Sequence, residues 1–171
     1  GGGRMDEGSK RSSSIKLLLI DIDGVMTNGT KAWDSFGNYV SKSYNDKDFT
    51  AIKLLKLSGV KVCFLSGDRK TNEAMAKKRH IDFIFSRQKH KDINNICKVY
   101  SVDIKDVGYV GDDYYDVPTL RMVGHSFCPS DAPLGVKKVC DKTLNAKGGT
   151  GVIAEIYDNE FDCYLNEDWL K

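Results

Sequence analysis

The sequence has little histidine, no two cysteines in C-x-x-C spacing and no long apolar run. Its three His and five Cys are scattered, so a zinc site is not indicated. The apolar runs fall short of the roughly 20 residues that cross a bilayer, and no signal peptide precedes the first of them. The net charge of +2 predicts neither a nucleic-acid nor a membrane partner. We expect a cytoplasmic protein with reduced cysteines, namely Cys63, Cys97, Cys128, Cys140 and Cys163.

What the chain does have is the composition of an ordinary globular domain. It contains 171 residues, of which 40% are hydrophobic and 29% are charged, enough for one domain with a sizeable core. Residues 1–14 are rich in Gly, Ser and charge and have no apolar period, so we interpret them as a disordered leader or a cloning remnant. Residues 15–171 are predicted to form the folded domain.

Short apolar runs alternate with segments of helical period. Runs that are apolar on both faces are typical of buried parallel strands, and they occur at 15–23, 60–67, 81–86 and 107–113, with a possible fifth at 125–129. Helices are expected at 48–59, 69–79, 91–102 and 116–124, with apolar stripes formed by Phe49, Ile52, Leu55 and Leu57 and by Ile93, Ile96 and Val99. This alternation predicts an α/β fold with a doubly wound parallel sheet.

One segment interrupts the alternation. Residues 29–44 have strand-like apolar positions on both sides of a Gly37-Asn38 turn, which predicts a β-hairpin directly after the first strand. The stretches from Asp21 to Ser66 and from Ser66 to Asp112 are filled by the hairpin and the predicted strands and helices. Neither stretch has room for a separate cap domain.

Acidic residues follow two of the predicted strands. Asp21 and Asp23 end the first, and alternation along a strand points them the same way. Asp112 and Asp116 lie just after the fourth. A lone D-x-D is usually a pair of solvated aspartates, and an Asp at a helix start is often a cap. Two clusters at the carboxyl edge of one sheet instead predict a site for a hard divalent cation.

Two further candidates gain weight only from the acidic clusters. Ser66 and Gly67 end the second strand, where a hydroxyl and main-chain N–H groups can hold a phosphoryl oxygen, although Ser-Gly is also an ordinary turn. Lys89 precedes the third helix and can offset phosphate charge. Lys91 is the competing choice in the same K-H-K run.

These motifs together resemble the haloacid dehalogenase superfamily of phosphotransferases. The resemblance lies in D-x-D-G-V-x-T-x-G from Asp21, the strand-ending Ser66, Lys89, and G-D-D-x-x-D at 111–116. It implies that Asp21 is the nucleophile, which forms an aspartyl-phosphate, and that Asp23 is the acid and base. It also implies that Ser66, Gly67 and Lys89 bind the phosphoryl group. Mg²⁺ would be held by Asp21, the Asp23 carbonyl and Asp112, supported by Asp113 and Asp116.

The chain is most similar to the capless subfamily that hydrolyses acidic keto-sugar phosphates. The similarity extends to S-D-A-P at 130–133 and G-G-T-G at 148–151. It implies a Mg²⁺-dependent 3-deoxy-D-manno-octulosonate 8-phosphate phosphatase. It also implies a homotetramer in which neighbouring subunits cover the site. Trp33, Phe36 and Tyr39 on the hairpin are candidate interface residues, although they could instead pack on their own domain.

Some positions depart from the subfamily pattern. Octulosonate-type members usually carry Arg where this chain has Asp68, Thr150 and Ala154, and relatives often have Gly at the position of Phe49. Two alternatives therefore stay open: a nonulosonate 9-phosphate phosphatase, or the oligomerisation module of an acylneuraminate cytidylyltransferase.

Two other classes are less well supported. A binding module without catalysis would not need Asp21, Asp23, Lys89 and Asp112 intact. A two-component receiver domain also gathers acidic residues at strand ends, but it would carry its phosphorylated Asp on a middle strand.

Overall fold

The computed structural model describes residues 13–161 and residue 170. Residues 1–12 of the predicted leader, and Cys163, lie outside the described residues. Within the described part, no helix is both long and apolar enough to cross a membrane.

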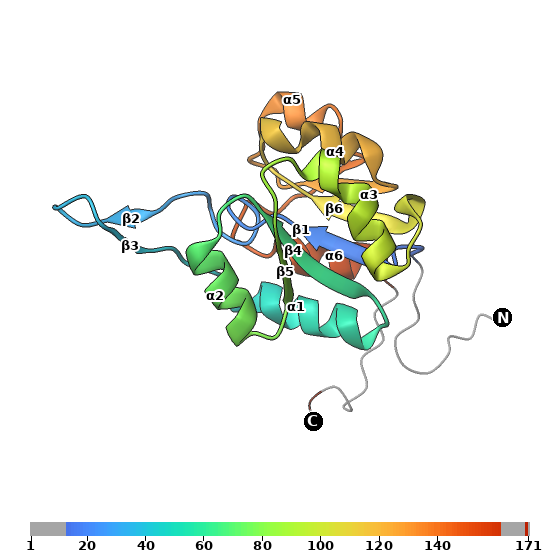
Figure 1. The fold of residues 1–171 in the computed structure, drawn as a ribbon, viewed down its shortest axis with the longest axis horizontal. Helices are drawn as coiled ribbons and strands as arrows, with labels where there is room; N and C mark the ends of the chain where they lie inside the picture. The colour runs from blue at the N-terminus through green and yellow to red at the C-terminus, as the bar shows by residue number, and fades with distance from the viewer. Residues whose placement is uncertain (1–12, 162–169, 171) are drawn as a thin grey trace.

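A six-stranded parallel sheet forms the centre of the domain (Figure 1), in the order β5-β4-β1-β6-β7-β8. The predicted α/β fold is confirmed. Strand β8 was not predicted, because its two exposed residues pair only with the end of β7 and form no apolar run. The strands are β1 (Leu17–Ile20), β4 (Lys61–Ser66), β5 (Asp82–Phe85), β6 (Val107–Val110), β7 (His125–Cys128) and β8 (Lys142–Thr143).

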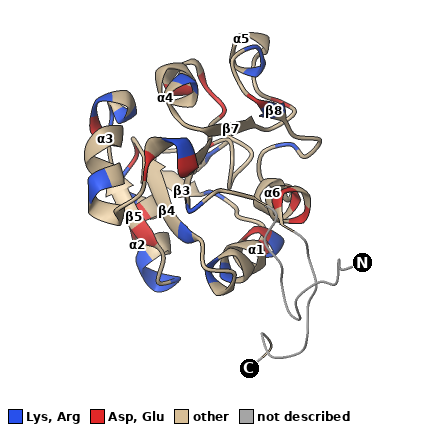
Figure 2. Ribbon diagram, turned by 90° about the vertical axis from the view of Figure 1, so that its right-hand side faces the viewer, with Lys and Arg blue, Asp and Glu red and all other residues tan. Residues whose placement is uncertain are grey.

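Helices cover both faces of the sheet, so the central strand β1 is apolar on both sides (Figure 1). Leu18 and Ile20 join the core under α1, α2 and α6, whereas Leu17 and Leu19 join the core under α3, α4 and α5. The helices are α1 (Asp46–Leu57), α2 (Lys70–Lys78), α3 (Lys89–Tyr100), α4 (Val117–Met122), α5 (Leu134–Lys137) and α6 (Val152–Glu160), with short 3-10 turns η1 (Ile104–Asp106) and η2 (Tyr114–Asp116). Figure 2 shows their basic residues spread over separate helices, interspersed with acidic ones.

Three details of the predicted core are wrong. Leu57 and Val99 are 61% and 68% exposed, and Leu54 and Cys97 are buried in the respective helices. Leu57 lies two positions from Leu55, and Val99 lies six from Ile93 although three from Ile96, so each falls off the face that holds the buried residues of its helix. The third predicted strand, β5, is only half-buried, because it pairs with β4 alone and forms the edge of the sheet.

The segment after β1 forms a separate two-stranded antiparallel sheet of β2 (Ala32–Trp33) and β3 (Tyr39–Ser41). It projects away from the body of the domain (Figure 1). Asp34 Oδ1 accepts the backbone N–H groups of Phe36 and Asn38, and Gly37 has a φ of 82°. Trp33 and Phe36 are 60% and 87% exposed, and the Trp33 ring contacts the Tyr39 ring of the same hairpin, with the ring centres 5.9 Å apart. Neither side chain is buried.

Helix α6 begins with help from a different helix. Its N-cap residue, Gly151, has no side chain, and the buried carboxylate of Asp48 on α1 takes that place. Asp48 Oδ1 accepts the backbone N–H groups of Ile153 at 2.9 Å and Ala154 at 3.2 Å. Burial raises the pKa of Asp48, which these N–H groups only partly offset. This contact fixes the Gly-rich segment that precedes α6.

We predict that Asp48→Ala lowers the free energy of unfolding by about 1–3 kcal/mol, because it leaves buried N–H groups without an acceptor. Asp48→Asn keeps an acceptor oxygen and removes a buried charge, so its loss should be smaller. Urea unfolding measures both. Asp46→Ala, at an exposed position of the same helix, is the control, with an expected change within about 0.5 kcal/mol. Equal losses for Asp48→Ala and Asp46→Ala would contradict the capping role.

Candidate active site

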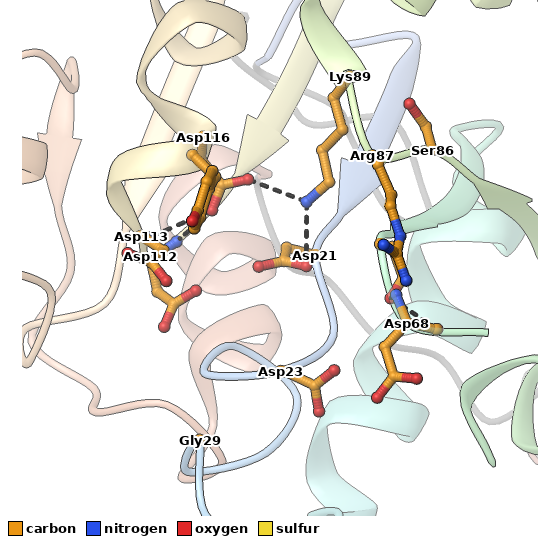
Figure 3. Close-up of a pocket in the computed structure, with 13 residues that line it drawn as sticks. Asp21, Asp23, Gly29, Asp68, Ser86, Arg87, Lys89, Asp112, Asp113 and Asp116 are labelled. Carbon is orange, nitrogen blue, oxygen red and sulfur yellow. Dashed lines mark hydrogen bonds and ion pairs between the residues drawn. The ribbon is translucent and has the colours of Figure 1, made fainter. Parts of the chain in front are cut away.

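The candidate site lies where the strand order reverses, at the carboxyl ends of β4, β1 and β6. Here a pocket of about 490 Å³ opens (Figure 3). It contains every residue predicted for the site. The lining residues are Asp21, Asp23, Gly29, Ser66, Gly67, Asp68, Ser86, Arg87, Lys89, Asp112, Asp113, Tyr115 and Asp116.

Three carboxylates crowd together on one side of the pocket. One oxygen each of Asp21, Asp112 and Asp116 lies within 4.8 Å of the others. Burial raises the pKa of Asp21 well above its ordinary value and that of Asp112 to about 7. Repulsion from Asp116 adds to both shifts, whereas Lys89 opposes both and a hydrogen bond with Asp21 lowers the pKa of Asp112. A divalent cation that prefers oxygen ligands would relieve the repulsion among these carboxylates. The Asp23 carboxylate points to the other side, toward Asp68 (Figure 3).

The contacts of Asp116 distinguish it from the other two carboxylates. Its Oδ1 accepts hydrogen bonds from Lys89 Nζ at 2.9 Å and from the Tyr109 hydroxyl. Its Oδ2 accepts the backbone N–H groups of Asp112 and Asp113, both at 3.1 Å. Because both oxygens are already occupied, Asp116 fits the role of holding Lys89 and the 111–113 loop. Asp21 and Asp112 fit the role of direct cation ligands.

Asp113 is exposed and serves as the N-cap of η2. Its side chain accepts the Tyr114 backbone N–H, and Asp116 completes the capping box. Asp113 therefore caps the η2 turn as well as lining the rim of the pocket.

Lys89, rather than Lys91, reaches the carboxylates. Its Nζ lies 3.1 Å from Asp21 Oδ1, whereas Lys91 is exposed on α3 and does not line the pocket. Burial lowers the pKa of Lys89, but Asp21 and Asp116 more than offset this, so its pKa is raised. The ammonium group therefore stays charged at neutral pH.

Ser66 ends β4 with its hydroxyl facing the next loop. Its Oγ accepts the Asp68 N–H at 3.1 Å and an Asn72 Nδ2–H at 3.1 Å. Gly67 lies beside it on the pocket wall. This arrangement brings a hydroxyl and a turn of the main chain to the same pocket as Asp112.

The first loop needs a residue without a side chain at position 24. Gly24 has a φ of 87°, and a Cβ there would lie 1.7 Å from Asp112 Oδ2. The G-G-T-G segment supports this loop from behind, since Gly149 N–H donates to the Val25 carbonyl at 2.9 Å. Gly148 N–H in turn donates to Asp131 Oδ1 of the S-D-A-P segment at 3.0 Å.

The sequence analysis missed several pocket or near-pocket residues, including Gly29, Ser86 and Tyr115 on the pocket wall. Lys42, Asn72 and Tyr109 contact the predicted residues, and Arg87 lines the pocket itself. Of these four, only Tyr109 left a signal, as a polar side chain within the apolar β6. Lys42, Asn72 and Arg87 lie on a hairpin, a helix and a loop, which come close to the site only when the chain is folded.

Comparisons with known proteins identify the family of the chain. Residues 76–156 match the haloacid dehalogenase-like hydrolase family. A 3-deoxy-D-manno-octulosonate 8-phosphate phosphatase of Haemophilus influenzae is 30% identical over 155 residues, covering 87% of this chain and 84% of its own. The chain belongs to the haloacid dehalogenase superfamily. It is a phosphatase of that superfamily, and it groups with the octulosonate 8-phosphate phosphatases.

Two further relatives support the assignment. The corresponding phosphatase of Yersinia pestis is 31% identical over 157 residues, covering 90% of this chain and 83% of its own. A cobalt-bound structure of the deoxy-D-mannose-octulosonate 8-phosphate phosphatase from Haemophilus influenzae is 32% identical, with a TM-score of 0.80. The superposition covers 85% of this chain and 86% of that one.

We predict that Gly24→Ala weakens divalent cation binding by about 10- to 100-fold, because the new methyl group displaces the Asp112 carboxylate. Calorimetric titration with Mn²⁺ or Mg²⁺ measures this. Gly37→Ala is the matched control, since Gly37 also has a positive φ but no atom within 4 Å of the new Cβ. Equal affinities for the two variants would remove Asp112 from the cation site.

Proposed function

We propose that this phosphatase uses Mg²⁺ to hydrolyse an acidic keto-sugar phosphate, with 3-deoxy-D-manno-octulosonate 8-phosphate as the leading substrate. The observation that carries the proposal is the contact of Lys89 with Asp21 beside Asp112. This contact places a carboxylate nucleophile, the ammonium group of Lys89 and carboxylate ligands for a metal ion in one pocket. The similarity to octulosonate 8-phosphate phosphatases supports the choice of substrate.

The residues suggest a two-step reaction. Asp21 attacks phosphorus, the bond to the sugar oxygen breaks, and Asp23 gives that oxygen a proton. Water then attacks the aspartyl-phosphate while Asp23 takes its proton, which releases inorganic phosphate. Lys89 and Ser66 hold the phosphoryl oxygens. Mg²⁺, when bound by Asp21, Asp112 and the Asp23 carbonyl, neutralises charge on the transferred group.

Arg87 supports an acidic substrate. Its guanidinium lies 5.9 Å from the centre of the Phe85 ring at the exposed rim of the pocket. No carboxylate pairs with it among the described residues. By contrast, Asp68, which stands where octulosonate-type relatives carry Arg, pairs with Lys31 at 3.3 Å. Arg87 is therefore the cation we assign to the sugar carboxylate.

We predict phosphate release from 3-deoxy-D-manno-octulosonate 8-phosphate in the presence of Mg²⁺, and its loss in EDTA. Asp21→Asn should lower kcat by at least about 10³-fold, because the nucleophile is lost. Asp46→Asn, at an exposed position of α1, is the control and should keep full activity. Nonulosonate 9-phosphates form a second arm, because Asp68 departs from the octulosonate pattern. No release from any sugar phosphate would overturn the proposal.

We further propose a cytoplasmic homotetramer in which neighbouring subunits cover the open pocket. The described cysteines, all free, fit a reducing compartment. The exposed Trp33 and Phe36 offer an apolar contact at the tip of the hairpin.

We predict that Phe36→Asp dissociates the tetramer, because a charge replaces an apolar side chain in the contact, and that it lowers kcat/KM. Light scattering and the phosphate-release assay measure the two effects. Val99→Asp, at an exposed apolar position on α3, is the control and should leave the tetramer intact. A monomeric wild-type protein would contradict the proposed assembly.

A further inference from the structure

A buried lysine stands behind the pocket, where the proposed reaction does not yet use it. Lys42 directly follows β3 at the base of the hairpin, and its side chain is only 1% exposed. Its Nζ lies 2.7 Å from Asp23 Oδ1, 3.0 Å from Asn72 Oδ1 and 3.6 Å from Asp68 Oδ2. Burying an ammonium group is costly unless it is paired, so this placement calls for an explanation.

Asn72, on α2, holds the second oxygen of the same carboxylate. It is fully buried, and its Nδ2 lies 3.0 Å from Asp23 Oδ2 and 3.1 Å from Ser66 Oγ. Its Oδ1 accepts hydrogen bonds from Lys42 and from the Tyr44 hydroxyl. One amide therefore links the proposed acid to the proposed phosphate-binding hydroxyl, and the amide itself is held from two sides.

Neither residue is placed to touch the substrate. Lys42 and Asn72 do not line the pocket. Lys42 donates hydrogen bonds to Asp23 Oδ1 and Asn72 Oδ1, forms a longer ion pair with Asp68, and has almost no exposed side-chain surface. Among the residues given a role in the reaction, Lys42 contacts Asp23, and Asn72 contacts Asp23 and Ser66. The Asp23 side chain is 30% exposed and would otherwise be free to rotate.

We propose that Lys42 and Asn72 are positioning residues that hold the Asp23 carboxyl in line with the leaving-group oxygen. This inference rests on the proposed role of Asp23 as the acid. When the phosphorus–oxygen bond breaks, its electron pair stays on the sugar oxygen, and Asp23 must deliver a proton there. Fixing both Asp23 oxygens, one through Lys42 and the other through Asn72, sets the direction of that delivery. The hairpin base thus reaches the chemistry without entering the pocket.

The test compares substrates with poor and good leaving groups. A sugar phosphate needs its leaving oxygen protonated, whereas p-nitrophenyl phosphate leaves as a stable phenolate and does not. In Lys42→Met we expect kcat/KM to fall about 10²-fold or more for the sugar phosphate and less than about 10-fold for p-nitrophenyl phosphate. Lys42→Arg should recover part of the loss. Asp23→Asn should show the same pattern, and adding Lys42→Met to it should cause little further loss.

Lys31→Met is the matched control, because Lys31 joins the hairpin to Asp68 without touching Asp23. It should leave the ratio of the two kcat/KM values unchanged. Equal losses on both substrates in Lys42→Met, or an additive loss in the double variant, would overturn the inference and leave the phosphatase proposal intact. Full activity in Asp23→Asn would instead remove Asp23 from the mechanism, and no wild-type turnover would reject the proposed function itself. Circular dichroism checks that each variant is folded.

Discussion

The site depends on one electrostatic constraint: three carboxylates and one lysine are held in a desolvated space at the end of β1. Asp21, Asp112 and Asp116 repel one another there, and burial makes their charges more costly. Lys89 offsets part of that charge, and a divalent cation bound to Asp21 and Asp112 would offset the rest. The repulsion would destabilise a cluster that served only the fold. The same cluster suits a site that binds a metal ion together with a phosphoryl group.

The surrounding loops are built to permit this crowding. Gly24 and Gly111 stand where a Cβ would meet the carboxylates of Asp112 and Asp116. Both carboxylate oxygens of Asp116 accept hydrogen bonds, one from Lys89 and the other from the backbone of the 111–113 loop. Behind the first loop, G-G-T-G rests on Val25 and on Asp131, and Asp48 fixes the helix that follows. Segments more than 100 residues apart therefore share one task, which is to keep the first strand end rigid.

The pocket divides into two halves of different character. The Asp112 side gathers the carboxylates suited to a cation, whereas on the other side Asp23 and Ser66 are hydrogen-bonded to a group behind the pocket wall, Lys42 and Asn72. Asp21 lies between them (Figure 3). Such a division suits a phosphatase, because one half can stabilise the transferred phosphoryl group while the other handles the proton of the leaving alcohol. The hairpin contributes to the second half from its base and presents Trp33 and Phe36 at its far end.

The sequence by itself determined the α/β fold, the strand ends and the acidic motifs. Apolar runs and the residues that end them are local properties, so Asp21, Asp23, Ser66 and Asp112 could be placed at one edge of a parallel sheet. Their catalytic roles stay predictions drawn from the family resemblance. Only the tertiary structure decided between Lys89 and Lys91, because a shift of two residues along α3 separates a side chain that reaches Asp21 from one that is exposed. Only it brought Lys42 and Asn72 to Asp23, since contacts between a hairpin, a helix and a strand end leave no periodic signal in the chain.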